Sequence, residues 1–439
     1  MKMGKKFWMG GIAMVCGTLL AGSAFGQGAA LRAVSPISES VAGAVTAAPI
    51  DAAGALYWNP GSISGIQGDD ISINASFVFA QSTLGSTMYT PAGVPFLSGS
   101  TDSHSGAIPV PSMAVVKHIK NSPFTVGFSL AGIAGARTNY GGSGAVSGIL
   151  PTGHPVDINP ILSDSMLGRL SSDVEVFQMA PTVSYRLSDN LSIGVAPTLT
   201  VARLIASPLL LAPVDNDGHW APGAGTRYAC GAGFQAGIYL QTASAWDFGL
   251  SFKSPQWMEK FKYQYTYADG TAGTASFGLD YPMIISLGTA YRGIDRWLFS
   301  TDFRYFNWGA ADGFNDGGFT SEHALNGLGW KDQFAVATGV SYQMTETLTL
   351  RGGLCYNTNQ IPDEMTIYNV ASPLNMQYSY HVGGTIDLGD QWLLSAAYSH
   401  VFQNRSEYTY KDYPLPNTSM DVWSTASADA VWMGLSKRF

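Results

Sequence analysis

The chain contains repeated stretches in which large apolar residues alternate with small ones. Between Leu191 and Val201 the odd positions are Leu, Ile, Val, Pro, Leu and Val, and the even positions are Ser, Gly, Ala and Thr. Successive side chains of a β-strand point to opposite faces, so this pattern predicts a strand with one fully apolar face. The same alternation recurs in four other segments: 124–130, 246–253, 297–305 and 378–388.

Two features favour a membrane-spanning barrel over a soluble β-sandwich. The side chains on the second face of these strands are small and uncharged, whereas a solvated face would carry many Lys and Glu. Only 12% of all residues are charged. Short turns, such as 120–122 and 188–190, also separate pairs of strands. Between these pairs lie long connections, namely 81–111, 133–172, 205–226, 309–331, 358–376 and 411–425. Short turns at one end and long loops at the other are typical of outer-membrane barrels.

The fold class that follows is all-β, a transmembrane antiparallel barrel of about 14 strands. No apolar run after residue 26 reaches the ~18 residues of a membrane helix, so a closed barrel is the expected way to cross a bilayer. The predicted strands are 71–80, 112–119, 123–132, 173–186, 190–204, 227–241, 245–267, 273–291, 296–308, 332–343, 347–358, 377–388, 391–410 and 426–439.

The first 26 residues have the pattern of a secretory signal peptide. A basic start is followed by an apolar stretch over 7–24 and by the small-x-small site Ala24-Phe25-Gly26. Loss of the three lysines in this segment would take the net charge from −8 to −11. A charge of that sign argues against nucleic acid as a partner. The two later cysteines alternate onto opposite faces, Cys230 outward and Cys355 toward the lumen, so no disulfide is expected.

Residues 27–68 are rich in Ala and Gly and lack alternation. They contain Tyr57-Trp58-Asn59-Pro60-Gly61 just before the first predicted strand. This motif resembles the aromatic-Asn-Pro-Ala-Gly sequence of the FadL/TodX family of outer-membrane transport proteins, although here the Ala after Pro is missing. Ser254-Pro255-Gln256-Trp257-Met258 and the terminal Phe439 add to the resemblance. The resemblance implies a plug, or hatch, formed by residues 27–68 inside a barrel formed by 69–439.

The resemblance also implies a location and a mode of release. The protein would span the outer membrane of a Gram-negative cell among lipid and lipopolysaccharide, and Phe439 would be read by the barrel-assembly machinery. Hatch movement would let an apolar ligand leave sideways through a kink in the third strand. Gly127, Gly132 and Gly135 are compatible with such a kink, because glycine permits bends in strands.

Two external segments are apolar enough to form a ligand groove. Asn159-Pro160 could begin a short helix that places Leu162, Met166 and Leu170 on one face. The other segment contains Leu204, Ile205, Leu209, Leu210 and Leu211. Exposed apolar loops often mark binding sites, but these side chains could equally pack loop against loop.

The expected function is passive transport of hydrophobic small molecules, with long-chain fatty acids, alkanes and monoaromatic hydrocarbons all possible. The inward rows hold few charges: Glu175, Asp247, Lys253, Asp302, Arg304 and Asp387. The seven His residues show no zinc spacing and no nucleophile motif occurs, so we expect no metal, no cofactor and no enzymatic activity. The protein is expected to be a monomer. The alternative function is that of a binding barrel, such as an adhesin or phage receptor, that transports nothing.

Overall fold

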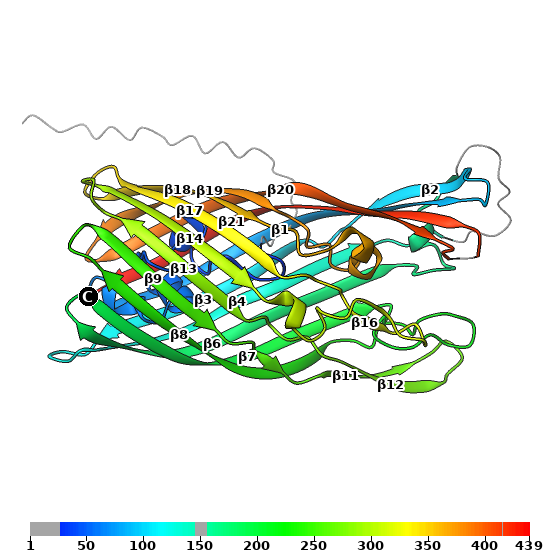
Figure 1. The fold of residues 1–439 in the computed structure, drawn as a ribbon, viewed down its shortest axis with the longest axis horizontal. Helices are drawn as coiled ribbons and strands as arrows, with labels where there is room; N and C mark the ends of the chain where they lie inside the picture. The colour runs from blue at the N-terminus through cyan, green and yellow to red at the C-terminus, as the bar shows by residue number, and fades with distance from the viewer. Residues whose placement is uncertain (1–26, 145–155, 415) are drawn as a thin grey trace, which may run out of the picture.

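The computed structural model describes residues 27–144, 156–414 and 416–439. The predicted signal peptide, residues 1–26, lies outside them. The described residues form one long antiparallel β-barrel with short turns and the C-terminus at one end and extended loops at the other (Figure 1). This confirms the predicted fold class. None of the described helices is long and apolar enough to cross a membrane.

Fourteen crossings of the barrel wall lie within the described residues, and the second crossing is divided into two strands. The first and last strands pair from Asp70↔Arg438 to Tyr89↔Ser419, which joins the two ends of the sheet. The wall strands are β1 (Asp70–Tyr89), β2 (Pro95–Asp102) with β3 (Ala107–His118), β4 (Phe124–Tyr140), β6 (Leu170–Ser188), β7 (Leu191–Ser207), β8 (Arg227–Gln241), β9 (Trp246–Lys253), β13 (Ile284–Tyr291), β14 (Trp297–Phe306), β17 (Gln333–Gln343), β18 (Leu348–Asn357), β19 (Tyr378–Gly389), β20 (Trp392–Lys411) and β21 (Ser419–Arg438).

The remaining elements lie in the external loops and in the N-terminal segment, residues 27–68. The loops carry β5 (Val156–Asp157), β10 (Trp257–Met258), β11 (Phe261–Thr266), β12 (Ala272–Phe277), β15 (Gly318–Phe319), β16 (Leu325–Gly327) and the 3₁₀ helices η2 (Pro160–Leu162), η3 (Trp308–Ala310) and η4 (Asp363–Asn369). The N-terminal segment carries α1 (Pro36–Ser40), α2 (Ala52–Trp58) and the 3₁₀ helix η1 (Ser62–Gly65).

The apolar rows face outward as the alternation predicts. Val195, Phe248 and Phe299 are among the exposed large apolar side chains on the wall, whereas the alternating residues are mostly buried. Cys230 is exposed and Cys355 is buried, and both are free thiols. Glu175 departs from expectation. It lies outside the lumen, where it forms ion pairs with Arg137 and Arg203 at 3.1 and 2.9 Å.

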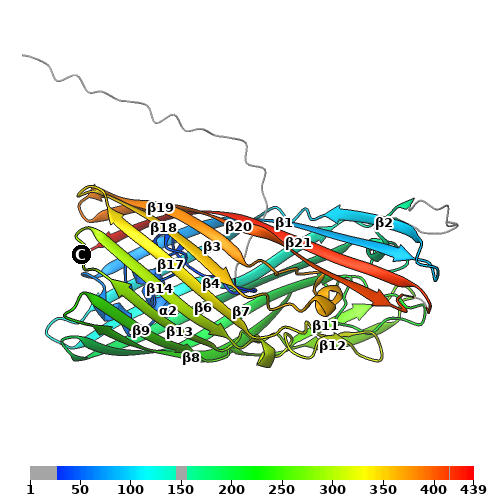
Figure 2. The ribbon, with the colours of Figure 1, turned by 45° about the horizontal axis from the view of Figure 1, so that its top comes forward.

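Several boundary predictions are wrong. β4, predicted over 123–132, extends to Tyr140, and β21, predicted over 426–439, begins at Ser419. The predicted strands 245–267 and 273–291 do not continue through the wall, because β9 ends at Lys253, before Pro255, which has no N–H for the sheet. The chain beyond folds into a separate hairpin of β11 and β12, visible at the loop end in Figure 2. The first strand, predicted over 71–80, instead extends to Tyr89.

The predicted helix after Asn159 does not form. Pro160 begins only the three-residue η2, and the Ser163 hydroxyl donates to the Pro160 carbonyl at 2.7 Å. Such a local side-chain bond competes with helix continuation. Gly168 then adopts a positive φ of 59°, and β6 starts at Leu170.

The N-terminal segment lies within the half of the barrel nearest the short turns (Figures 1 and 2). A ring of inward-facing glycines makes room for it. A Cβ at Gly194 would come within 2.3 Å of the Pro60 carbonyl, and one at Gly353 within 2.6 Å of Val41. The other members of this glycine ring are Gly127, Gly237, Gly249, Gly288, Gly339, Gly383 and Gly434. The missing side chains let backbone pack directly on the wall.

Candidate functional site

An apolar cavity lies between the external loops and the N-terminal segment. It encloses about 1070 Å³ of space not filled by protein atoms, including its mouth open to solvent. Its walls come from β6, β7, the segments around η3 and η4, and Ala29 of the N-terminal segment. We call this space the outer cavity. Ligand cavities are typically concave and mainly apolar, so it is the leading candidate for a binding site.

The structure separates the eight predicted groove residues into three groups. Leu170, Leu204, Leu210 and Leu211 line the outer cavity. Leu162, Met166 and Leu209 pack against other buried side chains of the loops instead. Ile205 lies on the row of β7 that faces away from the lumen, together with Val201. Leu204 and Ile205 belong to β7 itself, whereas the sequence placed them in or beside a loop.

The aromatic residues that line the outer cavity were not predicted from the sequence. The rings of Trp308, Phe314 and Trp330 pack together with centroid separations of 4.5 to 4.9 Å, and Tyr281 contacts Trp308 at 6.3 Å. All four residues line the cavity. The high density of aromatic residues between 305 and 330 was the available signal, but it ran from the end of the predicted strand 296–308 into the predicted long loop 309–331.

The outer cavity contains no basic side chain among its described lining residues, and its one acidic group is Asp280. A carboxylate oxygen of Asp280 accepts a hydrogen bond from the Met258 N–H at 2.8 Å. Burial raises the pKa of Asp280 above that of an ordinary carboxyl group, and the nearby charge of Asp312 raises it further, while the Met258 N–H opposes both. The site is therefore poor at holding an anion.

The Tyr57–Gly61 motif forms the turn that seats the N-terminal segment. The Asn59 side-chain amide donates to the Thr46 carbonyl at 2.8 Å and to the Ile238 carbonyl of β8 at 3.0 Å. Its carbonyl oxygen accepts from the Gly61 N–H at 3.0 Å. Because Asn59 is fully buried, these bonds satisfy polar atoms that water cannot reach. The motif thus joins segment and wall.

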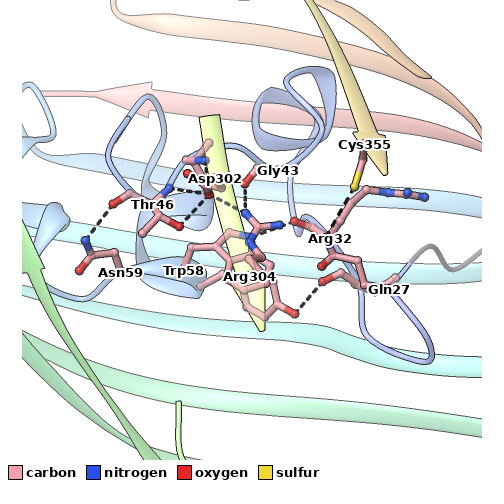
Figure 3. Close-up of polar contacts among 12 residues, drawn as sticks. Gln27, Arg32, Gly43, Thr46, Trp58, Asn59, Asp302, Arg304 and Cys355 are labelled. Carbon is pink, nitrogen blue, oxygen red and sulfur yellow. Dashed lines mark hydrogen bonds and ion pairs between the residues drawn. The ribbon is translucent and has the colours of Figure 1, made fainter. Parts of the chain in front are cut away.

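Charged groups on β14 hold the middle of the N-terminal segment (Figure 3). One carboxylate oxygen of Asp302 accepts from the Val45 and Thr46 N–H groups at 3.1 and 3.0 Å and from the Thr46 hydroxyl at 2.7 Å. Arg304 donates to Asp302 at 2.7 Å and to the Gly43 carbonyl. The Arg304 guanidinium also lies 3.5 Å from the centre of the Trp58 ring.

Lys253 adds a second basic side chain beside the motif. Its amine lies 3.5 Å from the centre of the Tyr57 ring and 4.7 Å from that of Trp58. The amine is buried and has no hydrogen-bond partner among the described residues. Tyr57 and Trp58 therefore pack against both basic side chains, Lys253 and Arg304.

The third crossing, β4, is irregular where the sequence placed glycines. Its pairing with β6 shifts between Gly132 and Ala134, and its pairing with β3 ends at Ser112↔Ala131. Beyond Ala131, the backbone of the N-terminal segment bonds to the edge of β4 in place of β3. The Leu31 N–H donates to the Ile133 carbonyl at 2.8 Å, and the Gly135 N–H donates to the Ala29 carbonyl at 3.2 Å.

A small second cavity lies beside this part of β4. It contains about 330 Å³ of empty space, and its lining includes 80–82 of β1, 136–138 of β4 and Met376. We call it the side cavity. β1 and β4 line it together near the break between β2 and β3. Of the three predicted gate glycines, Gly135 lines the outer cavity, Gly127 abuts Leu56, and Gly132 abuts Val110.

Among the described residues, no group of three or more His, Cys, Asp or Glu side chains is placed to hold a metal ion. Phe439 is 65% exposed at the short-turn end, and its backbone N–H donates to the Asp69 carbonyl at 2.9 Å.

Comparison with known proteins gives the same fold. The profile of the family described as "Outer membrane protein transport protein (OMPP1/FadL/TodX)" matches residues 17–439. A FadL homologue of Pseudomonas aeruginosa superimposes with a TM-score of 0.70 at 15% identity, covering 94% of this chain and all of that one. The toluene transporter TbuX of Ralstonia pickettii gives 0.61 at 15% identity, covering 93% and 99%. The toluene transporter TodX of Pseudomonas putida gives 0.59 at 17%, covering 96% and 100%. No curated protein matches by sequence.

Proposed function

Because the chain belongs to the FadL/TodX family of outer-membrane transport proteins, we propose that it carries uncharged hydrophobic small molecules passively across the outer membrane. The observation that carries this proposal is the outer cavity, which is apolar, open to the outside and placed directly against the N-terminal segment. Transfer of an apolar molecule into it gains roughly 0.8 kcal/mol per buried CH₂. No energy source is needed if the ligand moves down its gradient.

The charge of the outer cavity favours hydrocarbons over fatty acids. A fatty-acid carboxylate would lose its hydration without meeting a cation, and it would face the acidic Asp280. An alkane or a monoaromatic hydrocarbon has no such cost. The rings of Trp308, Phe314 and Trp330 offer edges and faces against which an aromatic ligand can pack. Two neighbours of similar fold are toluene transporters, which supports the same class.

The N-terminal segment is the proposed hatch, and lateral release is the proposed exit. Residues 29–31 lie between the outer cavity and the edge of β4. Breaking the two backbone bonds that join them to Ile133 and Gly135 would connect the outer cavity with the side cavity. A ligand would then leave sideways through the wall into the membrane, where an apolar molecule is most soluble.

Two adjacent residues of β7 provide a matched test. Leu204 lines the outer cavity and Ile205 faces outward. Full burial of a Leu side chain is worth about 1.5–3 kcal/mol, so Leu204→Ser should weaken toluene binding by about tenfold or more, whereas Ile205→Ser should leave it unchanged. The measurements are binding of radiolabelled toluene to purified protein and its uptake by cells.

The same assay separates the alternatives. Wild-type levels of binding and uptake in Leu204→Ser would remove the outer cavity from the path. Binding without uptake would favour the non-transporting receptor barrel. Stronger uptake of a long-chain fatty acid than of toluene would reject the uncharged ligand class while leaving the transport path intact.

A further inference from the structure

A polar cavity occupies the short-turn end of the lumen, on the opposite side of the N-terminal segment from the outer cavity. It contains about 1100 Å³ of empty space, including its open mouth. The N-terminal segment contributes 49–50 and 65–67 to its lining, and the wall contributes inward-facing residues of β14, β17 and β18. Short turns face the periplasm in outer-membrane barrels, so we call it the periplasmic mouth.

Four arginines line the periplasmic mouth, against one lining carboxylate, Asp295. Three of these arginines have an acidic neighbour: Arg292 lies 2.6 Å from Asp247, Arg296 lies 3.7 Å from Asp295, and Arg438 lies 3.8 Å from Asp70. Arg351 has no carboxylate within 4.0 Å among the described residues. It donates one hydrogen bond to the Thr385 hydroxyl at 2.7 Å. The Arg351 guanidinium is thus held in a defined position, with the buried Asp51 carboxylate nearby but beyond ion-pair distance.

Three polar atoms of the periplasmic mouth lack hydrogen-bond partners among the described residues. They are Nε of Arg351, Nε of Arg438 and the hydroxyl oxygen of Ser341. Ser341 is only 7% exposed. Buried donors are normally satisfied, so Nε of Arg351 and the Ser341 hydroxyl call for an acceptor, whereas Nε of Arg438 already faces Asp70 at 3.8 Å. Guanidinium and hydroxyl donors together suit the oxygens of a carboxylate or phosphate, which form the stronger charge-assisted hydrogen bonds.

We propose that the periplasmic mouth is an oxyanion-binding site, centred on Arg351 and Arg438, for a small molecule that carries a carboxylate or phosphate group. The site is separate from the apolar path, and the proposal does not depend on the proposed transport function. Arg438 also donates to the Ile50 carbonyl at 3.3 Å, so an anion bound to Arg438 would contact a wall arginine that itself holds the N-terminal segment. An anion that binds only when the N-terminal segment is in place stabilises that position of the segment relative to a displaced one.

The test is calorimetric titration of the purified full-length protein in an uncharged detergent at constant chloride. Inorganic phosphate and succinate are titrated separately. We expect saturable binding of at least one of them, and the arm that binds identifies the phosphoryl or carboxylate class. Arg351→Gln should weaken that binding at least tenfold, and Arg351→Lys, which keeps the charge, should weaken it less. Arg169→Gln, on the external side, should leave the affinity unchanged.

A second readout follows the linkage to the N-terminal segment. Hydrogen exchange of residues 45–67 should slow when the bound probe is present, and this slowing should be lost in Arg351→Gln. Circular dichroism checks that each variant keeps its strands. Two results would overturn the proposal: no saturable binding of either probe to the wild type, or equal binding by wild type and Arg351→Gln, which would mean an adventitious ion only.

Discussion

At the scale of single residues, buried polar side chains decide where the N-terminal segment sits. Asn59 and Asp302 each bond to more than one backbone group that would otherwise be buried without a partner. Loss of such a side chain leaves those groups unsatisfied, which costs about 1–3 kcal/mol for each. These contacts are specific in direction, so they fix the position of the segment as well as its stability.

A pH dependence is predicted at the same scale from Asp280. Its pKa is raised by burial, so the group becomes neutral at a higher pH than an ordinary Asp, whose pKa is about 3.9. An uncharged ligand that displaces water from the carboxylate favours the protonated form. Binding of toluene should therefore strengthen as pH falls through the raised pKa.

Asp280→Asn is the control for this dependence. Its side-chain oxygen can still accept from the Met258 N–H, but the group no longer titrates. Toluene affinity of the variant should be flat between neutral and mildly acidic pH. An equal pH dependence in wild type and Asp280→Asn would assign the effect to another group.

At the scale of elements, the glycine ring and the irregular edge of β4 connect the wall to the N-terminal segment. Glycines at one level on neighbouring strands let backbone approach backbone, for example at the paired Gly194 and Gly237 beside Pro60 and Asn59. On β4, the backbone of 29–31 replaces pairing that β3 does not supply beyond Ala131. The wall and the N-terminal segment are therefore complementary in shape.

Two adjacent glycines of β18 test the ring. A Cβ at Gly353 would meet Val41 and Ala42 at 2.6–2.7 Å, whereas one at Gly352 would have its nearest neighbour at 3.8 Å. Gly353→Val should displace the segment and lower the melting temperature, as overpacking typically costs about 1–3 kcal/mol. Gly352→Val should melt near the wild type. Equal melting of both variants would show that the segment does not depend on this contact.

A reversible disulfide can test whether residues 29–31 must move away from the edge of β4 during transport. Ala30 and Ala134 form an antiparallel bridge, and such pairs have Cα separations suited to a disulfide. In a chain carrying Cys230→Ser and Cys355→Ser, the pair Ala30→Cys and Ala134→Cys should block toluene uptake when oxidised and restore it when reduced. Unchanged uptake by the oxidised protein would rule out release through movement of residues 29–31.

At the scale of the whole molecule, the membrane and the lumen impose opposite demands on the same strands. Outward residues such as Leu199 and Met433 meet lipid, and the inward rows enclose the N-terminal segment. The lumen is therefore filled by a separate part of the chain. Any path through the molecule must pass that part or leave through the wall beside it.

Removal of the segment should turn the protein into an open pore. Deletion of residues 27–60 takes away side chains that are almost all buried in the lumen and exposes Asp302 and Arg304 to water. In planar bilayers the deletion variant should conduct ions steadily, and the full-length protein should be almost silent. A silent deletion variant would contradict the proposed role as a hatch.

The sequence by itself determined the wall. Lipid contact and strand geometry act residue by residue, so alternation predicted most of the outward rows and the facing of Cys230 and Cys355, although Glu175 faces outward against that prediction. The resemblance pointed to residues 27–68 as an internal segment, with Tyr57–Gly61 as its distinctive motif. The tertiary structure alone decided which side chains share a cavity. Leu204, Trp308 and Trp330 meet only because distant loops fold over one another, and Arg351 and Arg438 line one cavity because the wall curves around it. Long-range packing of this kind leaves no periodic trace in the chain.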